Sequence, residues 1–273
     1  MSITPDSLAG MTLLLVLVRV VLNTTEALVS RREYQAAGIF SWKVLRVHRS
    51  WTSCGTVARL LDLGLAYPNY LWLMFLQLTC ALLIIAVRGS ARWVLMIVLA
   101  IELLSTLRNI DFGTESSDGV QLIVLSGMAA YFAFSTPVAR LIVLWFIAVV
   151  AMTAYFTAGL VKLNSHAWRH GTAIEVVLMT ENYGNQTLSR YIARVPKMKY
   201  VLCWATIAFE CSFPFVVLLG PKATLGLLSC GILFHLSIAI AMGLNEFLWS
   251  FVATYPAVLR LSFDFHIWTH HAF

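Results

Sequence analysis

The stretch Arg140–Leu163, RLIVLWFIAVVAMTAYFTAGLVKL, decides the fold class. It carries no charged residue between Arg140 and Lys162. Because about 20 apolar residues are enough for a helix to cross the hydrocarbon core of a bilayer, this stretch predicts a single membrane-spanning helix. Comparable runs recur along the chain, so we expect an all-α, polytopic membrane helix bundle of roughly six to eight transmembrane helices.

The overall composition supports a membrane protein. Of the 273 residues, 60% are hydrophobic and 12% are charged, and the mean hydropathy is +0.81. About a quarter of the residues of a soluble globular domain are charged. The apolar runs also lack the alternation of barrel strands, so helices are expected. The lipid bilayer is therefore the predicted solvent and first partner of this chain.

The predicted spans are the longest apolar runs. They are Leu8–Val29, Asn69–Val87, Trp93–Leu107, Gly119–Ser135, Arg140–Leu163, Val201–Gly220 and Thr224–Leu248, followed by a shorter apolar piece, Phe251–Leu261. Two long connections, Ser30–Pro68 and Asn164–Tyr200, are polar but contain Trp and Tyr, which is typical of amphipathic interfacial segments.

The formal charge of +6 is concentrated in a few connections. That distribution suits membrane flanks rather than a nucleic-acid groove, and we predict no nucleic-acid partner. The positive-inside rule, applied alone, places the two long connections in the cytoplasm. The five cysteines include no closely spaced pair, which argues against a disulfide framework or a cysteine zinc site.

Several ionisable residues fall inside the apolar runs, where each costs about 2.5 to 3.5 kcal/mol on insertion scales. Arg19, Glu102, Glu210 and His235 are the main ones, and we predict that they point into the bundle and line a polar cavity. His235 and Glu246 are expected on one face of a single helix. The alternative for each residue is an interhelical clamp: Arg19 with Glu26 or Glu102, Glu210 with a hydroxyl, and His235 with a carbonyl.

A second set of residues lies near the end of the run Arg140–Leu163. Tyr155, Gly159 and Lys162 share a helix face. Gly159 lets a neighbouring backbone or a flat ligand approach the lysine stem, and apolar surroundings would favour the neutral amine, a usable base. The alternative is a lysine that reaches from a helix end to the interface, and spacing alone favours this alternative.

Three runs resemble a known membrane family. YFTAGLVKLN at 155–164 with the following Trp168 and Gly171, FECSFPFVVLLGP at 209–221 and FHLSIAIAMG at 234–243 are similar to the horizontally transferred transmembrane (HTTM) domain. That domain is shared by vitamin K-dependent gamma-carboxylases and by bacterial proteins that mature the sporulation-delaying toxin. The resemblance extends over most of the chain and implies a single HTTM-like transmembrane domain at 1–273.

The resemblance implies a function. In the carboxylases, the lysine that matches Lys162 deprotonates reduced vitamin K, and a substrate glutamate is then carboxylated. Carried over, Lys162 is the catalytic base. Tyr155, Gly159, Glu210 and His235 are then cofactor-binding candidates for a reduced, vitamin K-like quinone.

Two further residues, Arg19 and Glu102, are candidates for positioning a substrate. The resemblance implies an integral protein of a bacterial inner membrane, with a peptide substrate and an accessory protein as partners. It places the lysine end of the helix on the outer side, against the charge count.

A non-catalytic function stays open beside the enzyme. In that alternative the chain is a membrane maturation or immunity partner of a peptide toxin, and Lys162 only pairs with a carboxylate. No metal is predicted, because the C-terminal residues Asp264, His266, His270 and His271 are better explained as part of an interfacial aromatic tail.

Overall fold

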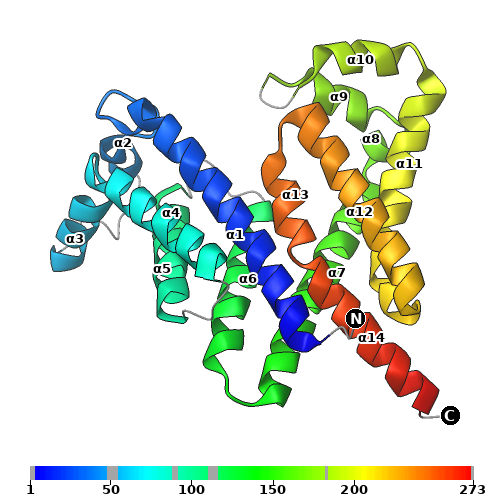
Figure 1. The fold of residues 1–273 in the computed structure, drawn as a ribbon. Coiled ribbons are helices and arrows are strands. Elements are labelled where there is room, and N and C mark those ends of the chain that lie inside the picture. Colours follow the sequence, from blue (N-terminus) through cyan, green and yellow to red (C-terminus); the bar gives the residue numbers. More distant parts are fainter. Residues whose placement is uncertain (1–3, 48–54, 88–91, 110–115, 182–183, 272–273) are drawn as a thin grey trace. The chain divides into compact units, whose positions relative to one another are not determined.

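The structure is a computed structural model that describes residues 4–47, 55–87, 92–109, 116–181 and 184–271. The described part is all-α, which confirms the predicted class (Figure 1). The chain divides into two compact units, Leu13–Arg140 and Met1–Thr12 with Leu141–Phe273. We call them the first-half unit and the second-half unit; α1 (Pro5–Val29) and α7 (Pro137–Asn164) extend across the division.

In its described part, the first-half unit contains most of α1 and five further α-helices. In chain order its other elements are η1 (Arg31–Tyr34), α2 (Trp42–Val47), α3 (Gly55–Leu65), α4 (Asn69–Val87), α5 (Arg92–Asn109) and α6 (Ser116–Ala133). Helix α4 packs on α5, and α5 packs on α6. The short elements η1, α2 and α3 lie in the predicted interfacial connection Ser30–Pro68.

A buried arginine fastens this connection to α5. The side chain of Arg108 is 0% exposed and donates to the backbone carbonyls of Leu65, at 3.2 Å, and Phe40. Its guanidinium lies 5.0 Å from the ring centre of Tyr34 and 4.3 Å from that of Tyr70. Burial raises the pKa of Tyr34 to about 12, with a further increase from Tyr70 and an opposing effect of Arg108.

The second-half unit contains most of α7 and the remaining elements. They are α8 (His166–Arg169), α9 (Ala173–Met179), α10 (Gln186–Ala193), α11 (Pro196–Ser212), η4 (Phe213–Leu218), α12 (Pro221–Met242), α13 (Asn245–Val252) and α14 (Tyr255–His271). Helix α12 packs on α13 and α14, and α11 contacts α8, α9 and α10. The short helices α8, α9 and α10 occupy the second predicted interfacial connection.

Within the described residues, five helical segments are long and apolar enough to cross a membrane. They are Pro5–Val29, Asn69–Val87, Pro137–Asn164, Lys197–Leu218 and Pro221–Met242. The predictions of single helices at Asn69–Val87 and Arg140–Leu163 are confirmed. The predicted spans Trp93–Leu107 and Gly119–Ser135 correspond to α5 and α6, which are not among these five segments.

The prediction of one helix at Thr224–Leu248 is wrong. Gly243 ends α12 in the left-handed region, with φ of 73°, and α13 begins at Asn245. This backbone conformation suits glycine and terminates a helix. The expected alignment of His235 and Glu246 on one helix is therefore also wrong, because the two residues belong to α12 and α13.

The helical geometry changes next to Pro214. Helix α11 ends at Ser212, and the chain continues as the 3-10 helix η4. Proline has no backbone N–H and cannot continue an α-helical ladder, so the hydrogen-bonding pattern changes here. The predicted apolar piece Phe251–Leu261 is also divided, between α13 and α14.

Candidate functional site

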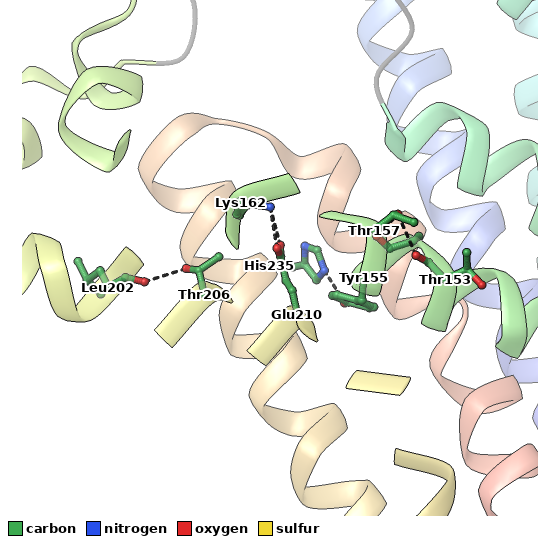
Figure 2. A network of polar contacts seen from close by, with 9 residues as sticks. Thr153, Tyr155, Thr157, Lys162, Leu202, Thr206, Glu210 and His235 are labelled. Carbon is green, nitrogen blue, oxygen red and sulfur yellow. Dashed lines mark hydrogen bonds and ion pairs between the residues drawn. The ribbon is translucent and has the colours of Figure 1, made fainter. Parts of the chain in front are cut away.

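Lys162 makes an ion pair with Glu210 (Figure 2). Lys162 lies in the last turn of α7, and Glu210 lies near the end of α11. The Lys162 Nζ donates to both carboxylate oxygens of Glu210, at 2.9 and 2.7 Å. The side chains are 21% and 6% exposed, respectively. The ammonium also lies 5.2 Å from the ring centre of Trp168, which adds a cation–π contact.

Gly159 makes this pair possible. A Cβ atom at this position would lie 2.8 Å from both the backbone nitrogen and the Sγ of Cys211, and 3.0 Å from the Cβ of Glu210. The missing side chain therefore allows α7 and α11 to approach closely, one turn before Lys162. Of the two explanations predicted for Gly159, the close approach of a neighbouring backbone is the one observed.

A chain of three hydrogen-bonded side chains lies in the same unit. The hydroxyl of Tyr155 on α7 is 2.6 Å from Nε2 of His235 on α12 and 2.7 Å from the hydroxyl of Tyr255 on α14. All three residues are buried. A side chain at Gly231, one turn before His235, would overlap the Tyr255 hydroxyl, so this glycine admits the tyrosine.

Aromatic rings enclose this chain. The ring of Tyr155 stacks on Phe213, with centroids 3.9 Å apart, and the imidazole of His235 stacks on Phe251, with centroids 4.7 Å apart. One face of each ring is thus covered by protein. A flat ligand therefore cannot stack on those two faces in this structure.

One polar atom of this group lacks a partner. The Nδ1 atom of His235 is buried and has no hydrogen-bond partner among the described residues. The positive charge of Lys162 also acts electrostatically on the His235 imidazole. A buried polar atom without a partner costs free energy, and such an atom beside an ion pair can bind a hydroxyl group of a ligand or a water molecule.

Arg19 is buried in the first-half unit. It donates from Nη1 to the backbone carbonyl of Ser117 and from Nη2 to Oδ1 of Asp118, both at 2.6 Å. The ion pair thus joins α1 to the start of α6. The interhelical clamp suggested for Arg19 is present, but its partner is Asp118 rather than Glu26 or Glu102.

Glu102 belongs to a polar network of the same unit. Its two carboxylate oxygens accept hydrogen bonds from Nε2 of Gln77 and Nε2 of Gln121, both at 2.7 Å. Gln77 also lies 3.4 Å from the hydroxyl of Thr24 on α1. The network connects α1, α4, α5 and α6, a stabilising arrangement in a bundle.

The candidate residues therefore fall into two sets. Tyr155, Gly159, Lys162, Glu210 and His235 lie together in the second-half unit, whereas Arg19 and Glu102 belong to the first-half unit. Burial is confirmed for Arg19, Glu210 and His235, and Glu102 is partly buried. A polar cavity that includes Arg19 with Glu210 and His235 stays a prediction.

Sequence reasoning missed some members of these networks. Tyr255 is one of them. The signal that could have found it is Gly231, which lies one helical turn before His235 on α12 and leaves room there for the Tyr255 hydroxyl. Gln77 and Gln121 are uncharged and did not stand out among charged candidates. In the predicted C-terminal tail, Asp264 pairs with Arg260 at 2.6 Å and accepts a hydrogen bond from Trp145 at 2.9 Å.

Comparisons of this chain with protein-family models, with curated proteins and with solved structures found no match. The relation to the HTTM family therefore stays a prediction from the three sequence runs.

Proposed function

We propose that the chain is an integral membrane protein with an acid–base site formed by Lys162 and Glu210. The observation that carries the proposal is the two-point contact between an ammonium and a carboxylate on two apolar helices. Both α7 and the segment containing α11 are among the five helices able to cross a membrane. Ionisable groups in such segments commonly serve a function, because burying them is costly.

The membrane arrangement in this proposal has more than five spans. Helices α5 and α6 are each 18 residues long and would add two crossings, for a total within the expected six to eight. The short helices of the two long connections would lie at the interface. We place the protein in a bacterial inner membrane, in line with the HTTM resemblance.

The Lys162–Glu210 pair can supply a base. A proton that moves from Nζ to the carboxylate over 2.7 Å leaves a neutral amine and a carboxylic acid. The neutral amine can then accept a proton from a substrate hydroxyl: the O–H bond breaks and an N–H bond forms on Lys162. Arginine could not do this, because its guanidinium stays protonated.

A reduced quinone fits the polar groups that the site offers. When bound, it supplies a weakly acidic hydroxyl and the reducing electrons. His235 Nδ1 is a buried atom able to hold that hydroxyl, and the Tyr155–Tyr255 pair fixes the orientation of the imidazole through its other nitrogen. In this proposal, Lys162 removes the proton and His235 positions the group that loses it. A peptide would be the final substrate, held by the helices or by an accessory protein.

The proposal is tested by quinol-dependent oxygen consumption. The purified protein in lipid nanodiscs is supplied with a reduced naphthoquinone, and Lys162→Arg is compared with wild type and with Lys222→Arg, an exposed lysine of α12. We expect Lys162→Arg to lose activity and Lys222→Arg to keep the wild-type rate. Equal rates in Lys162→Arg and wild type, or no rate above the protein-free control in wild type, would reject the enzyme.

A second function has a specific observation in its favour. The ion pair at the Gly159 contact has the form of a clamp between α7 and α11. In this alternative the chain is a non-catalytic maturation or immunity partner of a peptide toxin. Lys162→Arg would then keep the function, because arginine also pairs with a carboxylate.

A further inference from the structure

Helix α10 has one buried and one exposed side. Its N-cap, Asn185, accepts a hydrogen bond from the backbone nitrogen of Leu188 at 3.0 Å, which starts the helix despite its short length. Ser189 and Ile192 are each 2% exposed, and α10 packs on α9 and α11. Packing thus fixes which side of α10 faces outward at the end of the second-half unit where α11 begins (Figure 1).

The outward side is basic and aromatic. Arg190, Arg194 and Lys197 are exposed and spaced i, i+4 and i+7, so the two arginines share a face of α10 and its C-cap. Beside them, Tyr191 is 60% and Val195 is 41% exposed. We call these five residues the basic corner.

Few acidic groups neutralise the basic corner. The connection 164–200 contains two acidic residues, Glu175 and Glu181. Glu175 pairs with Lys199 at 2.6 Å, and Glu181 is exposed. Arg190 donates a hydrogen bond from Nε to the backbone carbonyl of Gln186 in its own helix, at 3.3 Å. The two arginines and Lys197 therefore keep a net positive charge at the surface.

We propose that the basic corner binds the phosphate headgroup of an anionic phospholipid. The corner lies at the start of the candidate span Lys197–Leu218, where the interface with water is expected. Guanidinium groups match phosphate oxygens in geometry and charge. The exposed Tyr191 and Val195 suit the boundary between headgroups and acyl chains, where tyrosine is enriched.

The expected preference follows from surface electrostatics. A basic residue near an anionic membrane surface contributes about 1 kcal/mol, or roughly a fivefold change in affinity. Replacing both arginines should lower the preference for an anionic lipid roughly 25-fold. The proposal goes beyond the acid–base site and requires only that the chain is inserted in a membrane.

The experiment measures lipid binding to the detergent-purified full chain. Phosphatidylglycerol and phosphatidylcholine of the same acyl composition are titrated, and bound lipid is counted by native mass spectrometry. The variant is Arg190→Gln/Arg194→Gln. The matched control is Arg31→Gln/Arg32→Gln, which removes two exposed arginines from η1. Arg190→Lys/Arg194→Lys, which keeps the charge, guards against a folding defect.

We expect wild type and the Arg31/Arg32 control to prefer phosphatidylglycerol, the lysine variant to keep most of that preference, and the glutamine variant to lose most of it. Equal preference in the glutamine variant and wild type would overturn the proposal. So would an equal loss in the Arg31/Arg32 control, or displacement of the lipid by millimolar inorganic phosphate, which would indicate a general anion site. Loss of quinol-dependent activity would not bear on this result.

Discussion

Replacing Glu210 by glutamine tests how much the structure depends on the ion pair. The amide removes the negative charge of Glu210, so the Lys162 ammonium loses its counter-charge. The Lys162 side chain is 21% exposed. Removing one member of a buried pair typically costs 3 to 5 kcal/mol. Because the lysine is partly accessible to solvent, we expect a smaller loss, about 2 kcal/mol, and a melting temperature lower by on the order of 5 °C.

The measurement is thermal unfolding in nanodiscs, with a matched control. Glu175→Gln removes the carboxylate of another ion pair of the same unit, 2.6 Å from Lys199, with side chains 24% and 23% exposed. Because Glu175 is 24% exposed and Glu210 only 6%, the Glu175 pair is better solvated and its loss should cost about 1 kcal/mol or less. The double variant Lys162→Met/Glu210→Met removes both charges and should recover most of the loss. A Glu210→Gln variant as stable as wild type, or a double variant no better than the single one, would refute the reasoning.

Other predictions concern packing and ionisation, each checked by thermal unfolding. Gly159→Ala should cost about 1 to 3 kcal/mol, because the new Cβ would lie 2.8 Å from the Cys211 nitrogen; Gly226→Ala, with open space, should be neutral. Arg108→Lys should cost about 2 kcal/mol or more, since lysine cannot reach two carbonyls and two rings together. A cost below 0.5 kcal/mol for Gly159→Ala or for Arg108→Lys would contradict the corresponding prediction. Tyr34 keeps its proton up to about pH 12 when folded but only to about pH 10 when unfolded. The free energy of unfolding should therefore fall by about 2 to 3 kcal/mol as the pH rises from 10 to 12. If it falls as steeply over this pH range in Tyr34→Phe as in wild type, the prediction is wrong.

Hydropathy alone was enough to predict some helices. Asn69–Val87 appears as α4 with the predicted bounds, because a long uncharged run leaves few other ways to satisfy its backbone. The end of α12 was missed for a physical reason. Glycine is common inside membrane helices, so Gly243 gave no clear stop signal, and its positive φ depends on how α13 packs back on α12.

The partners of the polar residues were harder to predict than their burial. The cost of exposing a charge to lipid predicts that Glu210 is buried, but it does not say which group pairs with it. The clamp alternative paired Glu210 with a hydroxyl, but the partner is Lys162, because Gly159 brings α11 close to α7. Similarly, Tyr255 reaches Tyr155 only because α14 packs on α12. Such pairings depend on contacts between distant segments, which one sequence does not specify.

The most direct test of the acid–base site is the charge swap Lys162→Glu/Glu210→Lys, measured for both melting temperature and quinol-dependent oxygen consumption. The swap keeps an ion pair between α7 and α11 but moves the amine to the other helix. We predict a melting temperature close to wild type, because the clamp is kept, together with loss of activity, because the base has moved. A swapped protein that is stable and fully active would contradict the assignment of Lys162 as the base.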